Sequence, residues 1–283
     1  MLEEEDGLNA LSELSLLEHL AVYSYGFVPQ SHTQLSDHSF PSLRYLNLNL
    51  FSQMEADWTL LRLRNLLKGL TTLKVLISNP FGLPSPRWFT ESLLPALAHA
   101  TYLEHLAVDF PDRPYRGAAI EVENMSALSV LSRLPLTTVR FSPIGLQRVD
   151  ASVAFEAVWS KVTYLDLPET NISLKGLPLF TRFPMLEHLV IQLYIDPRDL
   201  PEDGDLHETT GSCLHTLEGG KFSETEHCED KDTQLQIARF LLSLWPTLNQ
   251  VLWPKIVDRG VGASRQRRVV KSLNRELRAL KNK

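Results

Sequence analysis

Residues 103–108 read LEHLAV, and this stretch decides the fold because its first four residues occur three times in the chain. The tetrapeptide LEHL also begins at Leu17 and at Leu186. A looser pattern, Leu-x-x-Leu-x-apolar, recurs along almost the whole sequence, at intervals from 24 residues (Val162 to Leu186) to 34 residues (Leu214 to Leu248). Its first positions are Leu17, Leu43, Leu73, Leu103, Leu136, Val162, Leu186, Leu214 and Leu248. Nine near-regular matches predict one structural repeat used many times.

Each repeat is predicted to be a β-strand followed by a helix. Apolar and polar residues alternate at the end of each match, as in Leu46-Asn47-Leu48, and this period is typical of a strand with one buried face. Apolar stripes of helical spacing lie between the strands, at Leu60, Leu63, Leu67 and Leu70 and at Leu235, Ala238, Leu241, Leu242 and Trp245. Further helices are expected at about 87–99, 119–133 and 150–159. Because one repeat cannot bury its own apolar face, we expect the repeats to stack.

Strand–helix repeats with the pattern L-x-x-L-x-L resemble the leucine-rich-repeat family over nearly the whole chain. The best single match is residues 162–172, VTYLDLPETNI, in which Thr170 stands where many family members have Asn or Cys. The phrases FPMLEHLVI and WPTLNQVLW resemble the repeat region of fungal F-box/leucine-rich-repeat proteins. The resemblance implies an α/β fold, a horseshoe-shaped solenoid of about nine strand–helix repeats with a parallel concave sheet, over residues 1–254.

The resemblance also implies which residues would meet a partner, because positions three, five and seven of each repeat face the concave surface in this family. Position three is held by His19, Tyr45, Val75, His105, Thr138, Tyr164, His188 and Thr216. Position five includes Asn47, Arg140 and Asp166, and position seven includes Asn49, Asp109 and Gln192. Mixed polar and aromatic surfaces suit protein recognition. The expected protein-binding residues are Tyr45, Asn47, Asn49, His105, Asp109, Arg140, Tyr164, Asp166, His188 and Gln192; the alternative is an ordinary solvated sheet face.

The three LEHL histidines do not predict a metal site. Adjacent strands lie ~4.8 Å apart, so three repeats separate consecutive histidines by ~14 Å, whereas zinc holds each imidazole nitrogen at ~2.0–2.1 Å. A second group has the chemistry of metal ligands but no standard zinc spacing: Cys213, His215, His227 and Cys228. We therefore expect neither a metal nor a cofactor.

Composition and charge narrow the class of protein further. The chain has 283 residues, a net charge of −6 and two cysteines, which cannot build a disulfide framework. The acidic start MLEEEDG is unlike a secretory signal, and no apolar run approaches the ~20 residues of a membrane span. The sequence has no G-x-S-x-G elbow, phosphate loop or H-E-x-x-H motif. These observations predict a non-enzymatic intracellular protein, cytoplasmic or nuclear.

Two segments carry strong and opposite charge. Residues 199–232 hold eleven acids and two lysines, a net charge of −9, which predicts a solvated insertion or a contact for a basic partner. Residues 255–283 hold ten basic residues and two acids, a net charge of +8. From Ser264 this tail predicts an amphipathic helix that caps the solenoid, with the apolar stripe Val269, Val270, Leu273, Leu277 and Leu280. It could also dock on the acidic segment, or form a nuclear-import or nucleic-acid patch at residues 265–268, although the tail has no aromatic residue to stack on bases.

The functional expectation is protein–protein recognition on the concave sheet. Kinship with F-box proteins would imply a substrate presented to a cullin-type ubiquitin ligase through its adaptor. Residues 1–40 do not match an F-box, so no adaptor-binding residue is assigned. The alternative is a basic-tailed nuclear or nucleic-acid-associated scaffold. Because the first predicted strand lies close to Met1, we expect the chain to extend upstream, to pack against a partner there, or to self-associate through an exposed sheet edge.

Overall fold

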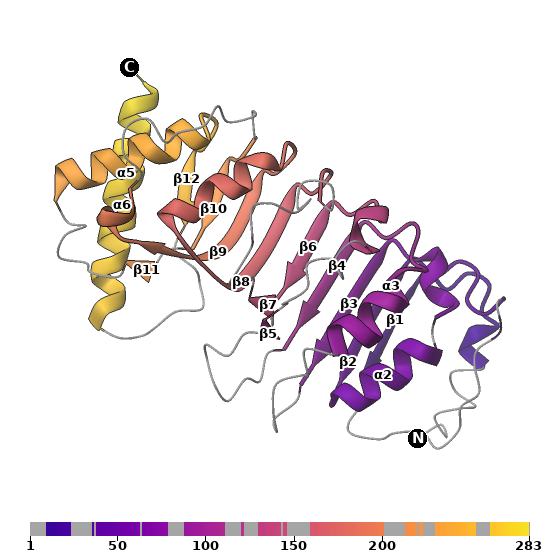
Figure 1. The fold of residues 1–283 in the computed structure, drawn as a ribbon. Coiled ribbons are helices and arrows are strands. Elements are labelled where there is room, and N and C mark those ends of the chain that lie inside the picture. The colour runs from indigo at the N-terminus through magenta and orange to yellow at the C-terminus, as the bar shows by residue number, and fades with distance from the viewer. Residues whose placement is uncertain are drawn as a thin grey trace. The chain divides into compact units, whose positions relative to one another are not determined.

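The computed structural model describes residues 10–23, 36, 38–62, 64–78, 88–110, 120–121, 130–142, 144–145, 159–200, 213–219, 221–222, 230–252 and 261–282. The chain forms two compact units. Unit 1 comprises Met1–Ile144 with Val153–Trp159, and unit 2 comprises Gly145–Ser152 with Ser160–Lys283. Each unit has an α/β architecture with parallel strands (Figure 1).

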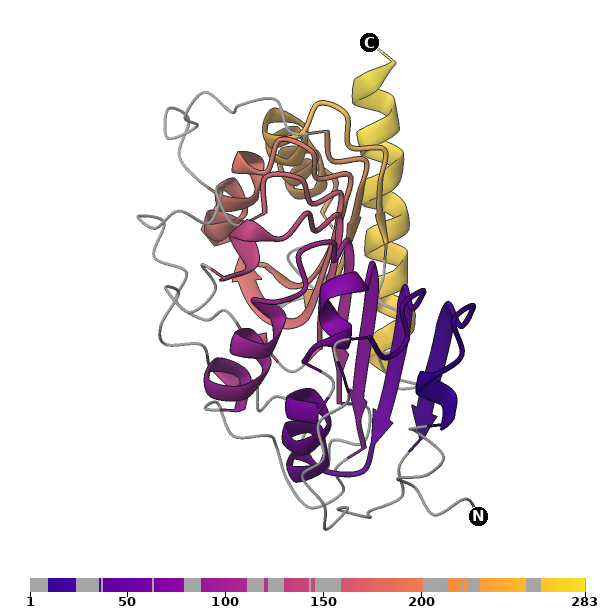
Figure 2. The ribbon, with the colours of Figure 1, turned by 90° about the vertical axis from the view of Figure 1, so that its right-hand side faces the viewer.

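The described part of unit 1 contains a parallel sheet of five strands that follow one another in chain order. They are β1 (His19–Tyr23), β2 (Tyr45–Leu50), β3 (Thr72–Ile77), β4 (His105–Asp109) and β6 (Thr138–Phe141). The helical segments are α2 (Gln53–Arg62), a 3-10 turn η1 (Leu66–Gly69), a π-helical segment η2 (Trp88–Leu93) and α3 (Leu94–Leu97). Figure 2 shows α2 and α3 on the same face of this sheet. Two-residue strands, β5 (Ile120–Glu121) and β7 (Ile144–Gly145), lie outside it.

Unit 2 contains a second run of parallel strands, in the order β8, β9, β10 and β12. Their bounds are β8 (Tyr164–Ser173), β9 (His188–Ile195), β10 (Thr216–Glu218) and β12 (Gln250–Leu252), and β11 (Lys221–Phe222) pairs with the end of β9. The helical segments are η4 (Leu174–Arg182), η5 (Pro197–Asp199), α5 (Lys231–Leu244) and α6 (Val261–Lys281). Helix α5 packs against α6, which also contacts β12.

Alternating burial explains why these segments are strands. In β2 the side chains of Leu46, Leu48 and Leu50 are buried, while those between them are half-exposed. The register aligns Leu46 with Leu73, Leu106 and Val139, so that buried residues of neighbouring strands lie side by side. Each fully buried leucine stabilises the fold by roughly 1.5–3 kcal/mol relative to an exposed one. The core therefore lies on the leucine face of each sheet, where the helices cover it.

A repeated backbone contact joins successive strands. Before seven of the described strands, the carbonyl of the preceding residue accepts hydrogen bonds from two consecutive N–H groups of the next repeat, at 2.8–3.3 Å. For example, the Glu18 carbonyl accepts from Arg44 and Tyr45, and the Arg44 carbonyl accepts from Thr71 and Thr72. The seven carbonyls that do this belong to Glu18, Arg44, Thr71, Glu104, Thr163, Glu187 and His215. The contact defines equivalent positions independently of any side chain.

Helix α2 begins where its sequence predicts a helix start. The Ser52 Oγ accepts from the N–H of Glu55, and the Glu55 Oε2 accepts from the N–H of Phe51 at 2.7 Å. This reciprocal arrangement is a variant of the capping box, and it satisfies backbone donors that the first helical turn leaves free. The carboxylate of Glu55 is almost fully buried by this contact.

Three expected helices differ from the observed ones. The apolar stripe from Leu60 to Leu70 does not form one helix, because α2 ends at Arg62 and a separate 3-10 turn carries Leu67. The helix expected at 119–133 is wrong at its start, where Ile120–Glu121 is a strand. The helix expected at 87–99 is present at residues 88–97, first as a π-helical and then as an α-helical segment. Of the helix expected at 150–159, residues 150–158 lie outside the described residues.

Helix α6 covers the outer edge of β12. The side-chain amide of Asn274 accepts from the N–H of Val251 and donates to its carbonyl, both at 2.7 Å. These two hydrogen bonds satisfy the N–H and the carbonyl of Val251 as a neighbouring strand would. The apolar face of α6 is buried, and it consists of Val269, Val270, Leu273 and Leu277. Along the described residues, no helix is both long and apolar enough to cross a lipid bilayer.

Candidate functional site

The face of each sheet opposite the leucines, which we call the polar face, carries rows of side chains set by strand register. In unit 1 the first row runs across β1, β2, β3, β4 and β6 and consists of His19, Tyr45, Thr72, His105 and Thr138. In unit 2 the equivalent row runs across β8, β9, β10 and β12 and consists of Tyr164, His188, Thr216 and Gln250. Each row brings residues from distant parts of the sequence to neighbouring strands.

All ten side chains expected to bind a partner lie on these polar faces. Unit 1 carries Tyr45, Asn47, Asn49, His105, Asp109 and Arg140, and unit 2 carries Tyr164, Asp166, His188 and Gln192. Nine of them are half-exposed or exposed. Asp166 is the exception, since only 5% of its surface is exposed. A partner could therefore touch Asp166 only through a small part of its side chain.

The prediction that Val75 lies on the polar face is wrong. Val75 was predicted to hold position three of its repeat, but it is 1% exposed and belongs to the leucine face. The register pairs Tyr45 with Thr72, so Thr72 takes that position. The sequence LTTLKVLI contains two overlapping Leu-x-x-Leu matches, and the strand pairing selects the earlier one, which begins at Leu70.

Ring and charge contacts hold the polar face of unit 1 in place. The rings of His19 and Tyr45 lie 5.3 Å apart, and the Nζ of Lys74 lies 5.4 Å from the Tyr45 ring centre. On the neighbouring strands β4 and β6, the Nη2 of Arg140 donates to the Oδ2 of Asp109 at 3.0 Å. Such contacts reduce the side-chain entropy that binding would otherwise remove, which favours association.

Two amides on the same face remain available for a ligand. Among the described residues, the side chains of Asn47 and Asn49 form no hydrogen bond, and both are half-exposed. Each amide can donate two hydrogen bonds and accept two. Unit 1 therefore presents hydrogen-bonding groups beside a fixed tyrosine and a fixed arginine.

The polar face of unit 2 carries an aromatic pair beside two acids. The rings of Tyr164 and His188 lie 4.8 Å apart, and the Nε2 of His188 lies 3.6 Å from the Oε2 of Glu218. In the next row, Val190 lies between Asp166 and Glu218. This face is therefore more acidic than that of unit 1, where Lys74 and Arg140 contribute positive charge.

The histidines of the LEHL stretches do not form a metal centre within the described residues. His19 and His105 occupy strands separated by β2 and β3, as the repeat spacing predicts. Across the part of the chain that the structure describes, no group of three or more His, Cys, Asp or Glu side chains could hold a metal ion. Their shared position reflects the repeat and not a shared ligand.

The second group of candidate ligands is only partly described. Cys213 is an exposed free thiol, and the Nδ1 of His215 lies 3.3 Å from the carbonyl of Thr247. His227 and Cys228 lie outside the described residues. The acidic segment 199–232 is likewise only partly described, and its described residues include β10, β11 and the start of α5.

Sequence reasoning missed several polar-face residues, among them Thr72, Lys74, Glu218 and Gln250. Thr72 and Lys74 were hidden by the wrong register of their repeat. Glu218 holds position five of the repeat that begins at Leu214, so counting positions in that repeat would have found it.

Comparison with known proteins gives no relative from which a role could be transferred: no family model matches the chain, and no curated protein matches it significantly.

Proposed function

We propose that this chain is a leucine-rich-repeat-type solenoid that binds a protein partner on its polar face and catalyses no reaction. One observation carries the proposal: aromatic, amide and charged side chains stand in register along the strands, while leucines fill the opposite face. A flat, ordered row of Tyr, Arg and Asn side chains offers the residue types that anchor protein interfaces. An open sheet face offers less to a small substrate, which needs a closed pocket.

The repeated backbone contact supports the solenoid part of the proposal. Seven equivalent carbonyls each bond two N–H groups of the next repeat, so these seven pairs of neighbouring repeats meet in the same way. Nearest-neighbour stacking of this kind is what defines repeat proteins. The finer proposal, that the chain recognises substrates for an F-box type ubiquitin ligase, rests on resemblance of the repeats to that family.

A comparison of two matched triple variants tests the polar face. The test variant carries Tyr45→Ala, Arg140→Ala and Tyr164→Ala. The control variant carries Tyr102→Ala, Arg133→Ala and Met185→Ala, which are exposed residues outside the strands. The wild-type chain and both variants would be used for affinity capture from cell lysate, with bound proteins identified by mass spectrometry.

A protein that binds the wild-type and control chains but is lost from the test variant would support the proposal. Equal capture by all three forms would refute a role for the polar face. A ubiquitin-ligase adaptor captured by all three forms would support the F-box kinship separately, because the adaptor would then bind elsewhere.

The alternative, a basic-tailed nuclear or nucleic-acid-associated scaffold, needs a different test from removal of the tail. Deleting residues 264–283 would expose the core, since Val269, Leu273 and Leu277 are buried. Charge substitutions on the solvent side of α6 leave that packing intact and separate the two functions.

A further inference from the structure

The solvent side of α6 carries a continuous row of cations, which we call the basic face. Its members are Arg267, Arg268, Lys271, Arg275, Arg278 and Lys281, and all six are exposed. The acid in this part of the helix, Glu276, is only 8% exposed and lies on the buried side. The basic face is therefore not interrupted by a negative side chain.

Helix geometry places the basic and buried sides opposite each other. At 3.6 residues per turn, the six cations fall within an arc of about 140°, and the buried residues fall within an arc centred on the other side. From Arg267 to Lys281 the row is ~21 Å long at 1.5 Å per residue. The apolar half of this helix is already used against α5 and β12, so its cationic half is what it presents outward.

Most of these cations have no partner within the described part of the chain. Arg267, Arg268, Lys271 and Arg278 form no ion pair or hydrogen bond there. Arg275 lies 3.5 Å from Glu276, and Lys281 donates to Asn249 at 2.8 Å.

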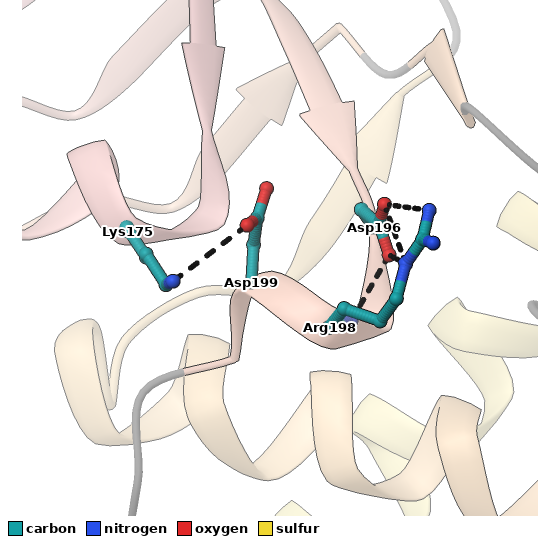
Figure 3. Close-up of polar contacts among 4 residues, drawn as sticks. All are labelled: Lys175, Asp196, Arg198 and Asp199. Atoms are coloured by element: carbon teal, nitrogen blue, oxygen red, sulfur yellow. Dashed lines mark hydrogen bonds and ion pairs between the residues drawn. The ribbon is translucent and has the colours of Figure 1, made fainter.

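Two exposed cations elsewhere in unit 2 are paired with carboxylates. Figure 3 shows Arg198 bonded to both carboxylate oxygens of Asp196, with Nη2 to Oδ2 at 2.7 Å, and Lys175 3.8 Å from Asp199. What distinguishes α6 is that its exposed cations follow one another along one side of a single helix.

We propose that the basic face of α6 is a second interaction surface, which binds an acidic segment of a protein partner through its Asp and Glu carboxylates. Four of the six cations are arginines, whose forked guanidinium groups pair with both oxygens of a carboxylate. From Arg268 to Lys281 successive cations lie three or four residues apart, about one helical turn, so acids at the same interval on a partner helix would meet them. This surface is separate from the polar face of the sheet and does not depend on it.

The same observations disfavour two other polyanions. Insertion into an anionic membrane needs an apolar face, and that of α6 is buried in the protein. A single-stranded nucleic acid would find no aromatic side chain on this helix for base stacking.

Fluorescence anisotropy with the full chain tests the proposal. The probe is a fluorescein-labelled peptide rich in Asp and Glu, about 20 residues long so that it can span the basic face. The test variant carries Arg267→Glu, Lys271→Glu and Arg278→Glu, which leaves the buried residues untouched. The control variant carries Lys161→Glu, Arg133→Glu and Arg239→Glu, which changes the net charge equally at exposed positions outside α6. Circular dichroism checks that both variants are folded. If the Glu test variant does not fold, a milder test variant replaces it, with Arg267→Gln, Lys271→Gln and Arg278→Gln.

We expect the test variant to bind the peptide at least about tenfold more weakly than the control variant, and we expect added salt to weaken wild-type binding. An equal loss of peptide affinity in both variants would overturn the proposal, because net charge alone would then explain the binding. Absence of peptide binding would overturn it too. Tighter binding of duplex DNA or of phosphatidylserine vesicles than of the peptide, at the same salt concentration, would replace the acidic protein segment with phosphate as the ligand.

Discussion

At the scale of single residues, Gly219 shows how closely the backbone of unit 2 is packed. Its φ is +133°, and a Cβ added there would lie 1.8 Å from the carbonyl oxygen of Ile191. Its N–H donates to the carbonyl of Leu252 at 2.9 Å. The residue thus lets the chain leave β10 and continue into β11 along the same neighbour, β9. Glycine is required here by both conformation and space.

We predict that Gly219→Ala lowers the free energy of unfolding by at least about 2 kcal/mol, because the side chain forces strain or a shift of the backbone. The measurement is urea unfolding followed by circular dichroism. Gly69→Ala is the matched control: its added Cβ would meet the flexible end of Arg44 at 3.1 Å and the Leu43 carbonyl oxygen at an ordinary contact distance of 3.5 Å. Equal stability of the two variants would show that the segment around Gly219 relaxes freely.

A second residue-scale prediction concerns pH. Burial lowers the pKa of His99 below its ordinary value, and the charges of Arg64 and Lys68 lower it further. The Nε of Arg64 donates to the Nε2 of His99 at 2.7 Å, a bond that requires this nitrogen to be unprotonated. The folded state therefore holds the proton less tightly than the unfolded state. The resulting stabilisation is present above the ordinary histidine pKa and is lost as the pH falls through the lowered one.

Removing the neighbouring cation should reverse part of this shift. We expect Arg64→Ala to raise the pKa of His99, as followed by an NMR titration of the imidazole protons. Lys161→Ala, in unit 2, should leave the titration unchanged. A pKa that does not move in Arg64→Ala would mean that Arg64 has no influence on His99 in solution.

At the scale of elements, α6 stabilises β12 through one amide. We predict that Asn274→Ala lowers the free energy of unfolding by about 2 kcal/mol, since it leaves the N–H and the carbonyl of Val251 without their partner in a partly buried place. Hydrogen exchange at the Val251 amide should accelerate at the same time. Asn282→Ala, at the exposed end of the helix, is the control. Unchanged exchange at Val251 would contradict the edge-capping role.

Strands were easier to predict from the sequence than the segments between them. The alternation of leucine with polar residues identifies β2, β4 and β9 because strand burial depends on side-chain spacing alone. The same reasoning misplaced Val75, since LTTLKVLI fits two registers and only pairing with β2 chooses between them. It also joined α2 to η1, because apolar spacing continues from one to the other although residues 64–65 are not helical. The residues of the candidate surface follow from the strand register. Lys74 was missed because the predicted register of its strand was wrong.

At the scale of the whole molecule, the two outermost strands of the sheet order differ. The edge of β12 is covered by α6, whereas β1 pairs only with β2 among the described residues. Large apolar side chains are exposed beside β1, with Leu16 at 89% and Tyr23 at 59%. An open edge of this kind favours pairing with another chain. Pairing of this edge with the same edge of a second molecule would form a symmetric dimer.

We predict that the chain forms dimers in a concentration-dependent manner, as measured by light scattering after size-exclusion chromatography. Leu16→Glu combined with Tyr23→Glu should shift the equilibrium to the monomer, because charge at the edge opposes pairing. Met185→Glu, at another exposed apolar residue, should have no effect. A monodisperse wild-type monomer at high concentration would count against association through β1.

The backbone contact between repeats would allow the number of repeats to change during evolution. At seven positions in the described residues, one carbonyl accepts from two N–H groups, and the residue that supplies the carbonyl is Glu, Arg, Thr or His. The contact therefore does not depend on a particular side chain. A duplication of one whole repeat would therefore also duplicate the backbone groups that form this contact. The solenoid could therefore gain or lose whole repeats without compensating substitutions elsewhere. Related chains would then differ in their number of repeats as well as in their residues.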